Sequence, residues 1–98
     1  MTLRLLFHPA ARSELRDAQE WYESRVAGLG DEFAGAIEAA LTAIQQTPAG
    51  FPLVHGDVRQ AVLRRFPYSV LYIVESDAIV VLACFHHRRD PRVWRERA

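Results

Sequence analysis

The apolar positions follow a helical spacing in the first half of the chain and form strand-like runs in the second half. A helix is predicted over 9–26, with an apolar stripe of Ala11, Leu15, Ala18, Tyr22 and Val26. A second helix is predicted from Gly30-Asp31 to Thr47, with Asp31 available as its cap and a stripe of Phe33, Ile37, Ala40, Leu41 and Ile44. The short break at 28–30 predicts that the two helices form an antiparallel hairpin.

Strands are predicted at 2–7, 58–66, 68–75 and 78–87, where branched and aromatic apolar residues are frequent. Prolines and glycines mark 49–57 as a loop, and Ser76-Asp77 marks a tight turn. The segments 68–75 and 78–87 are apolar on both faces, which predicts that they lie centrally in the sheet. Residues 92–98 are expected to form a short tail of one or two helical turns.

This element order predicts one α+β domain spanning residues 1–98. The N-terminal strand comes first, then the antiparallel helical hairpin, then a three-stranded antiparallel meander that forms one small sheet, and finally a short C-terminal tail. The hairpin must cover one face of the sheet. The other face must either be covered by another segment or form a groove.

Composition places the chain among ordinary globular proteins, with 98 residues of which 50% are hydrophobic and 24% charged. The longest unbroken apolar run, 78–85, is far shorter than the roughly 18 residues that span a membrane. The N-terminus lacks the pattern of a secretory signal, and the single cysteine, Cys84, excludes an internal disulfide. These features predict a cytoplasmic protein without membrane contact, and an inert buried thiol at Cys84.

The charges are balanced in number but not in kind or position. Twelve acidic residues face twelve basic residues, and every basic residue is an arginine. Residues 1–50 hold four arginines against seven acidic residues, and residues 51–98 hold eight against five. The neutral total argues against indiscriminate binding to nucleic acid, whereas the basic second half is compatible with an anionic partner.

Several segments together carry a resemblance to a known family. They are Pro9-Ala10-Ala11, Trp21-Tyr22, the Gly28-Leu29-Gly30 break, Phe33, Gly50-Phe51-Pro52, Val58-Arg59, the run from Arg64 to Tyr72, and the run from His86 to Trp94. In this order and length the sequence resembles the RelE/ParE superfamily of bacterial toxins from type II toxin–antitoxin systems. The resemblance implies a toxin that a cognate antitoxin silences in a hetero-oligomer.

The superfamily has two kinds of target, and the residues of this chain favour one of them. Ribonuclease relatives cut messenger RNA on the ribosome with lysines and arginines on the sheet and a tyrosine or histidine near the C-terminus. This chain has no lysine, it has Ser69 where the family often has arginine, and it has Trp94 where ribonucleases have tyrosine. Arginine stabilises charge but cannot act as a base near neutral pH. The resemblance therefore favours the ParE-like branch, which is associated with DNA gyrase and has no known hydrolytic site.

A non-hydrolytic toxin needs a binding surface, and arginine suits bidentate contacts and stacking. The candidate target-binding residues are Arg59, Arg65, Arg88, Arg89, Arg92 and Trp94. Arg59 and Arg65 are expected to share one face of the strand 58–66. Trp94 has an alternative interpretation, as a side chain that folds back as a lid on the core, and His8 is expected to cap a helix or end a strand.

Two other functions remain open. A metal-independent ribonuclease would use His86, His87, Arg88 and Arg65, and an extended strand would direct only one histidine, with the arginine two positions later, to the open face. A non-toxic binding module is the third possibility. No metal or other cofactor is expected, because no ligand-pair spacing or glycine-rich phosphate loop is present.

Overall fold

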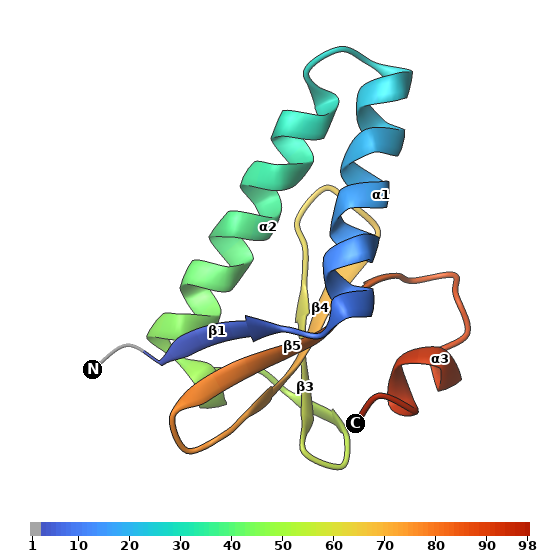
Figure 1. Cartoon of the computed structure of the whole chain (residues 1–98). Helices are drawn as coiled ribbons and strands as arrows, with labels where there is room; N and C mark the ends of the chain where they lie inside the picture. Colours follow the sequence, from blue (N-terminus) through green and yellow to red (C-terminus); the bar gives the residue numbers. More distant parts are fainter. Residues whose placement is uncertain (1–2) are drawn as a thin grey trace.

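Two long helices and a five-stranded sheet make up the fold in the computed structural model, which describes residues 3–98. In chain order the elements are β1 (Arg4–Phe7), α1 (Pro9–Arg25), α2 (Leu29–Gln46), the 3-10 turn η1 (Pro48–Gly50), β2 (Leu53–His55), β3 (Val58–Val62), β4 (Tyr68–Val74), β5 (Ala78–His86) and α3 (Arg92–Arg95). The predicted α+β class and helical hairpin are confirmed (Figure 1). The predicted start of the first strand at Thr2 lies outside the described residues.

The strand order in the sheet is β1-β5-β4-β3-β2, with β1 parallel to β5 and the other pairs antiparallel. β4 and β5 are central, as their two-sided apolar patterns predicted. β2 was not predicted, because it lies in the segment that prolines and glycines marked as a loop. It pairs with β3 at only two positions, and its three side chains are exposed, so no apolar alternation indicates it.

The predicted strand 58–66 is wrong at its end, because β3 stops at Val62. The backbone bends over 64–67, and Arg65 has a left-handed φ of 70°. The bend turns Phe66 into the core beneath the hairpin, where its ring meets Tyr22 at 5.0 Å and Phe33 at 5.3 Å. Burial of this aromatic ring accounts for the loss of the extended conformation that local preference favoured.

The hairpin packs on one face of the sheet through the two predicted apolar stripes. Ala11, Ala18, Phe33, Ile37 and Ile44 are all buried there. Val26, predicted as the last member of the first stripe, instead caps the end of α1 and is exposed. His8 caps the start of α1, because its Nδ1 accepts a hydrogen bond from the Ala10 amide at 3.0 Å; this prediction is confirmed.

The tip of the hairpin is held by Glu23 and not by the predicted cap Asp31. The Glu23 carboxylate accepts hydrogen bonds from the amides of Gly28 (2.9 Å) and Gly30 (3.0 Å), the free donors at the start of α2. A Cβ atom at Gly30 would lie 2.8 Å from the Gln19 carbonyl oxygen, so only glycine permits this close approach.

The second face of the sheet has its own apolar cluster, and the C-terminal tail covers it. Trp94 of α3 is only 5% exposed and packs with Val58, Leu71, Leu82, Ala83 and Phe85. Figure 1 shows α3 near the start of α1, at the opposite end from the hairpin tip. The predicted need for a cover on this face is therefore met by the chain itself, and Trp94 folds back as the alternative interpretation proposed.

A bulge in β5 supplies two neighbouring residues to this second cluster. Leu71 pairs with Ala83 and Tyr72 pairs with Val81, so Leu82 has no partner in β4. Leu82 and Ala83 both lie in the cluster beneath Trp94, although alternation would direct them to opposite faces. The extra residue therefore enlarges the apolar surface that the tail covers.

Removing the Trp94 ring is expected to weaken the fold. Trp94→Ala should lower the free energy of unfolding by about 3 kcal/mol, because truncating a buried aromatic residue loses burial and leaves a cavity. Val93→Ala, next to it but exposed, should change the stability by less than about 0.5 kcal/mol. Urea denaturation of the two variants measures the difference, and equal small effects would show that the tail is not docked.

Candidate functional site

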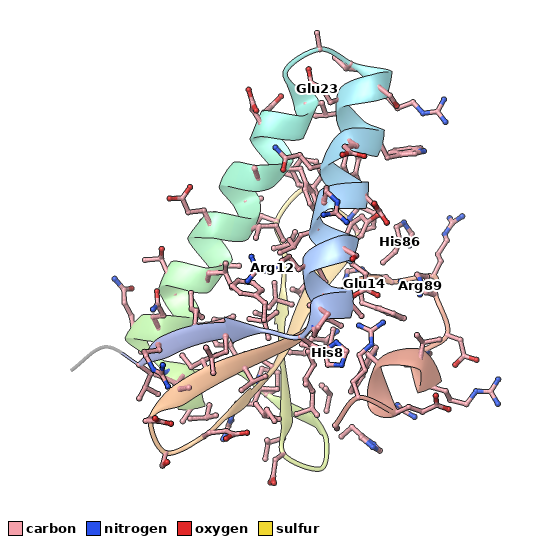
Figure 2. All side chains as sticks on the ribbon, viewed as in Figure 1. His8, Arg12, Glu14, Glu23, His86 and Arg89 are labelled. Carbon is pink, nitrogen blue, oxygen red and sulfur yellow. The ribbon has the colours of Figure 1, made fainter. Side chains whose placement is uncertain are left out.

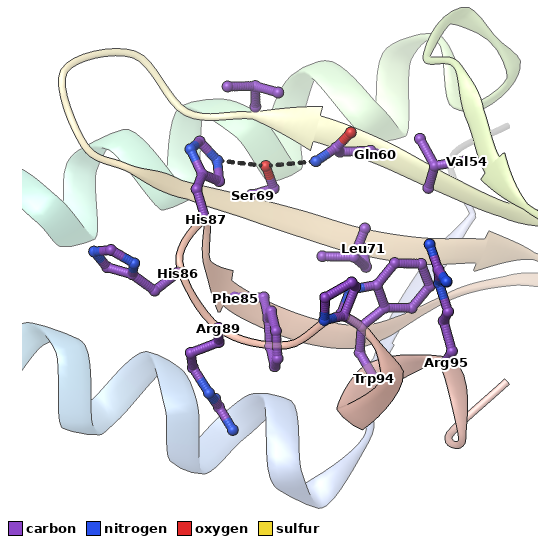
Figure 3. Close-up of a pocket in the computed structure, with 12 residues that line it drawn as sticks. Val54, Gln60, Ser69, Leu71, Phe85, His86, His87, Arg89, Trp94 and Arg95 are labelled. Atoms are coloured by element: carbon purple, nitrogen blue, oxygen red, sulfur yellow. Dashed lines mark hydrogen bonds between the residues drawn. The ribbon is translucent and has the colours of Figure 1, made fainter.

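A pocket of about 330 Å³ lies on the second face, between the sheet and the C-terminal tail (Figure 3). β2, β3, β4 and the end of β5 line one side, and the segment 87–95 lines the other. Its lining residues are Val54, Gln60, Val62, Ser69, Leu71, Phe85, His86, His87, Arg89, Pro91, Trp94 and Arg95. The charged groups are arginines without an acidic side chain among them, so the pocket favours an anionic ligand.

A chain of hydrogen bonds fixes the imidazole of His87 in this pocket. Gln60 Nε2 donates to Ser69 Oγ at 3.0 Å, and Ser69 Oγ lies 2.8 Å from His87 Nε2. Because Ser69 Oγ accepts from Gln60, we expect it to donate its own proton to His87 Nε2, an arrangement that requires the proton of the neutral imidazole to be on Nδ1. Ser69 is only 1% exposed, so it acts from the floor of the pocket.

His86 is directed to the other side of β5. Its ring meets Tyr68 edge to face at 5.1 Å, and its Nδ1 accepts a hydrogen bond from the Arg88 amide at 3.0 Å. The structure thus answers which histidine faces the second side of the sheet: His87 does. The alternation expected for an extended strand therefore continues from Phe85 to His87, although β5 ends at His86 and 87–89 form a turn.

Arg59 and Arg65 are not brought together, so the predicted shared face is wrong. Arg59 Nη1 donates to the carbonyl oxygens of Phe51 (2.6 Å) and Ala49 (3.2 Å). Its guanidinium therefore holds the loop before β2. Arg65 lies in the bend after β3 and pairs with Glu32 of α2 at 2.9 Å, with both side chains exposed. Neither residue lines the pocket.

The arginines after β5 differ in their ion-pair and aromatic partners. Arg92 pairs with Asp90 at 2.7 Å, and this contact holds the pKa of the Asp90 carboxyl below its usual value. Arg89 pairs with Glu14 at 2.8 Å and lies over the Phe85 ring at 4.2 Å. The Arg88 and Arg95 side chains form no ion pair within residues 3–98, and Arg95 lies over the Trp94 ring.

Glu14 on α1 connects the tail to both layers of the fold. Its carboxylate receives two hydrogen bonds from the Arg97 guanidinium, both at 2.9 Å, and one from the Cys84 amide at 3.2 Å. Arg97 also donates to the Leu82 carbonyl oxygen at 3.0 Å. Glu14 and Arg97 are each only 12% exposed (Figure 2 labels Glu14 beside Arg89). Because β1 pairs with β5 only as far as Val81, this ion pair binds backbone groups that β1 leaves open.

The chemistry of the pocket is limited by its residue types. The imidazoles among the lining residues are those of His86 and His87, and His87 Nε2 lies 2.8 Å from Ser69 Oγ. Cys84 lies on the other side of the sheet, and burial raises the pKa of its thiol to about 12, which agrees with an inert thiol. Residues 3–98 contain no group of three or more potential metal ligands. No helix in the described part is long and apolar enough to span a membrane.

Comparison with known proteins identifies the family. The family model described as "ParE toxin of type II toxin-antitoxin system, parDE" matches residues 5–91. The chain belongs to the ParE toxin family. The chain gave no match among curated proteins.

Two solved structures resemble this ParE family member in fold. A chain of the chromosomal ParDE toxin–antitoxin system from P. aeruginosa has 22% sequence identity and a TM-score of 0.73, over 87% of this chain and 96% of that chain. A chain of the toxin–antitoxin complex RelBE2 from Mycobacterium tuberculosis has 21% identity and a TM-score of 0.59, over 88% and 99%. The resemblance inferred from the sequence is thereby confirmed, and the two structures support the fold.

The sequence pattern does not indicate the polar residues that organise this candidate site. Glu14, Gln60 and Arg97 belong to no motif of the sequence, and Ser69 differs from its neighbours only as a replacement for the arginine that the family often has. Their partners are 9 to 83 residues distant in sequence, so no local pattern indicates them. The roles of the six predicted target-binding residues stay predictions.

The Glu14–Arg97 pair should contribute more to stability than the exposed Glu32–Arg65 pair. Glu14→Gln is expected to lower the free energy of unfolding by about 3 kcal/mol, because it leaves a buried guanidinium without its counter-charge. Glu32→Gln removes the same charge from a pair whose side chains are 51% and 69% exposed, and should cost less than about 1 kcal/mol. Urea denaturation distinguishes the two, and similar losses would contradict a special role for Glu14.

Ser69 is expected to set the tautomer of His87. In the unmodified chain at pH 8, long-range proton–nitrogen NMR correlations should show a protonated Nδ1 and an unprotonated Nε2 on His87. Ser69→Ala removes the donor to Nε2 and should shift the population toward the Nε2-protonated form. Ser24→Ala removes a hydroxyl bonded to the Trp21 carbonyl and should leave His87 unchanged. An Nε2 proton in the unmodified chain would refute the assignment.

Proposed function

We propose that this chain is the toxin of a type II toxin–antitoxin pair and that it acts by binding DNA gyrase without hydrolysis. Membership of the ParE toxin family supports the first part. The second part rests on the residue types of the pocket: its cations are arginines, which hold their protons, and its exposed imidazole is engaged by Ser69. Such a surface can grip carboxylates or phosphates more readily than it can transfer protons.

Arg88 and Arg95 are the best candidates for contacts with the target. Both are exposed, and both keep their charge free of ion pairs within the described residues. Arg95 of α3 lines the pocket, and Arg88 lies in the turn after β5, between the lining residues His87 and Arg89 in sequence. The Glu14–Arg97 pair anchors the tail that carries Arg95. Arg89 and Arg92 have acidic partners and would have to share or exchange them in a complex.

A cognate antitoxin is the proposed regulatory partner. The two solved structures with this fold are described as a ParDE system and as a RelBE2 toxin–antitoxin complex. Exposed apolar side chains on the β2–β3 side of the sheet, including Leu53 and Val62, offer a surface for such a partner. β2 is an edge strand of the sheet. An antitoxin strand would extend the sheet by pairing with it, and an antitoxin helix would cover the exposed apolar side chains.

A ribosome-dependent ribonuclease is the second candidate, and one observation favours it. His87, Arg89 and Arg95 line the same pocket, so one potential proton-transfer group lies among cations that could stabilise a phosphorane. A non-toxic binding module is the third candidate. The three predict different consequences when the chain is produced without an antitoxin.

Production of the chain in bacteria, followed by two assays, separates these functions. A gyrase-binding toxin should arrest growth, and the purified chain should block supercoiling by purified gyrase, without new transcript ends in the arrested cells. New transcript ends that disappear in a folded His87→Ala variant would instead identify a ribonuclease. Normal growth would contradict both toxin functions and would favour the non-toxic binding module.

The free arginines should control potency if the chain binds gyrase. The double variant Arg88→Gln, Arg95→Gln is expected to raise the concentration needed for half-inhibition at least about fivefold, since each lost charged contact contributes on the order of 1 kcal/mol. Arg16→Gln, which removes an exposed arginine from α1, is the matched control and should change potency less than about twofold. Equal effects of the two changes would point to overall charge rather than to this site.

A further inference from the structure

A second cleft, of about 530 Å³, lies between α1 and the ends of β4 and β5, and it shares His86 and Arg89 with the lining of the first pocket. One wall comes from α1, where Glu14, Asp17, Ala18 and Trp21 follow each other at intervals of three, one and three residues and so share a helix face. The opposite wall includes Tyr68 of β4 and His86 of β5. Figure 2 shows His86 and Arg89 across from Glu14 on α1.

Aromatic rings form a continuous surface across this cleft. Trp21 meets Tyr22 edge to face at 5.2 Å, Tyr22 meets Tyr68 at 6.2 Å, and Tyr68 meets His86 at 5.1 Å. Trp21 is 52% exposed, although tryptophan is usually well buried. The indole already attracts a cation of the chain, because the Arg25 guanidinium lies 4.7 Å from its ring centre.

Several polar groups of the cleft have no hydrogen-bond or ion-pair partner within residues 3–98. The hydroxyls of Tyr22 and Tyr68 form no hydrogen bond within residues 3–98, and burial raises the pKa of both phenols, so they remain protonated. Asp17 forms no ion pair in this part of the chain, whereas the charge of Glu14 is met by Arg89 and Arg97. One free carboxylate and two phenol oxygens therefore border an aromatic surface.

We propose that this cleft binds a basic side chain, an arginine or a lysine, presented by a partner protein. A guanidinium can donate to Asp17 and to the phenol oxygens while its plane lies against an aromatic ring. An acidic ligand would be repelled by Asp17, and an entirely apolar ligand would leave Asp17 and both phenols without partners. Arg89 lines both the cleft and the first pocket, but its charge is met by Glu14, which leaves Asp17 as the carboxylate of the cleft that is available to a basic ligand.

A pair of matched small ligands tests the proposal on the isolated chain. N-acetyl-arginine amide carries the cation, and N-acetyl-citrulline amide is its neutral counterpart of nearly the same shape. With the ionic strength held constant, the arginine ligand should shift the Trp21 indole resonance in a saturable manner, and the citrulline ligand should not. The buried Trp94 indole provides an internal reference that should not move.

Two variants assign the effect to the cleft. Asp17→Asn should weaken binding of the arginine ligand about fivefold, the scale of one exposed ion pair combined with a cation–π contact. Glu20→Gln removes an equal charge from α1 outside the cleft and should change binding less than about 1.5-fold. Equal binding of arginine and citrulline, equal effects of the two variants, or no saturable shift would overturn the proposal. The outcome is independent of gyrase inhibition, so the two proposals fail separately.

Discussion

The arrangement of this molecule depends most on the hydrogen bonds and ion pairs that the Glu14 carboxylate forms. It lies on α1 but binds the edge of β5 through the Cys84 amide, the end of the chain through Arg97, and the turn after β5 through Arg89. A carboxylate that is mostly withdrawn from water needs this many partners to offset its lost hydration. The result is a single polar junction that joins the hairpin, the sheet and the tail.

The junction explains why the same chain can present two unlike surfaces. With Arg97 and Arg89 drawn to Glu14, α3 is held over the second apolar cluster, and Arg95 lines the first pocket without an ion pair in residues 3–98. On the α1 side, the charge of Glu14 is met by these two arginines, whereas Asp17 forms no ion pair in the described residues. The neutral total charge of the chain therefore conceals an uneven distribution of charged groups over its surface.

The sequence predicted features that depend on local pattern and composition. The apolar stripes around Ala18 and Phe33 predicted the hairpin, and the two-sided apolar runs predicted that β4 and β5 are central. The bend at Arg65 could not be predicted in this way, because the burial of Phe66 against Tyr22 and Phe33 overrides the extended preference of its neighbours. β2 carries no signal at all, since its side chains are exposed and its pairing is backbone alone.

The sequence identifies candidate residues of the site but not their geometry. The run from His86 to Arg92 stays a prediction as a functional segment, and the contacts that its side chains make depend on partners distant in sequence. Ser69, itself bonded to Gln60, is the hydrogen-bond partner of His87 Nε2, and Glu14 is the partner of the Arg89 guanidinium. Hydrogen bonds between residues far apart in sequence produce no periodic pattern, so the sequence does not indicate them.

The unpaired Leu82 has a consequence for how this sequence can change. Up to Val81 the inward and outward positions of β5 follow one phase, and from Ala83 onward they follow the other. Deleting the unpaired Leu82 would bring Val81 and Ala83 into regular alternation, with both halves of β5 on their present faces. Deleting a residue elsewhere in the strand while the bulge stays would instead move the residues on one side of the deletion to the opposite face of the sheet. A change in the length of this strand is therefore compatible with the fold at the bulge and costly at its other positions.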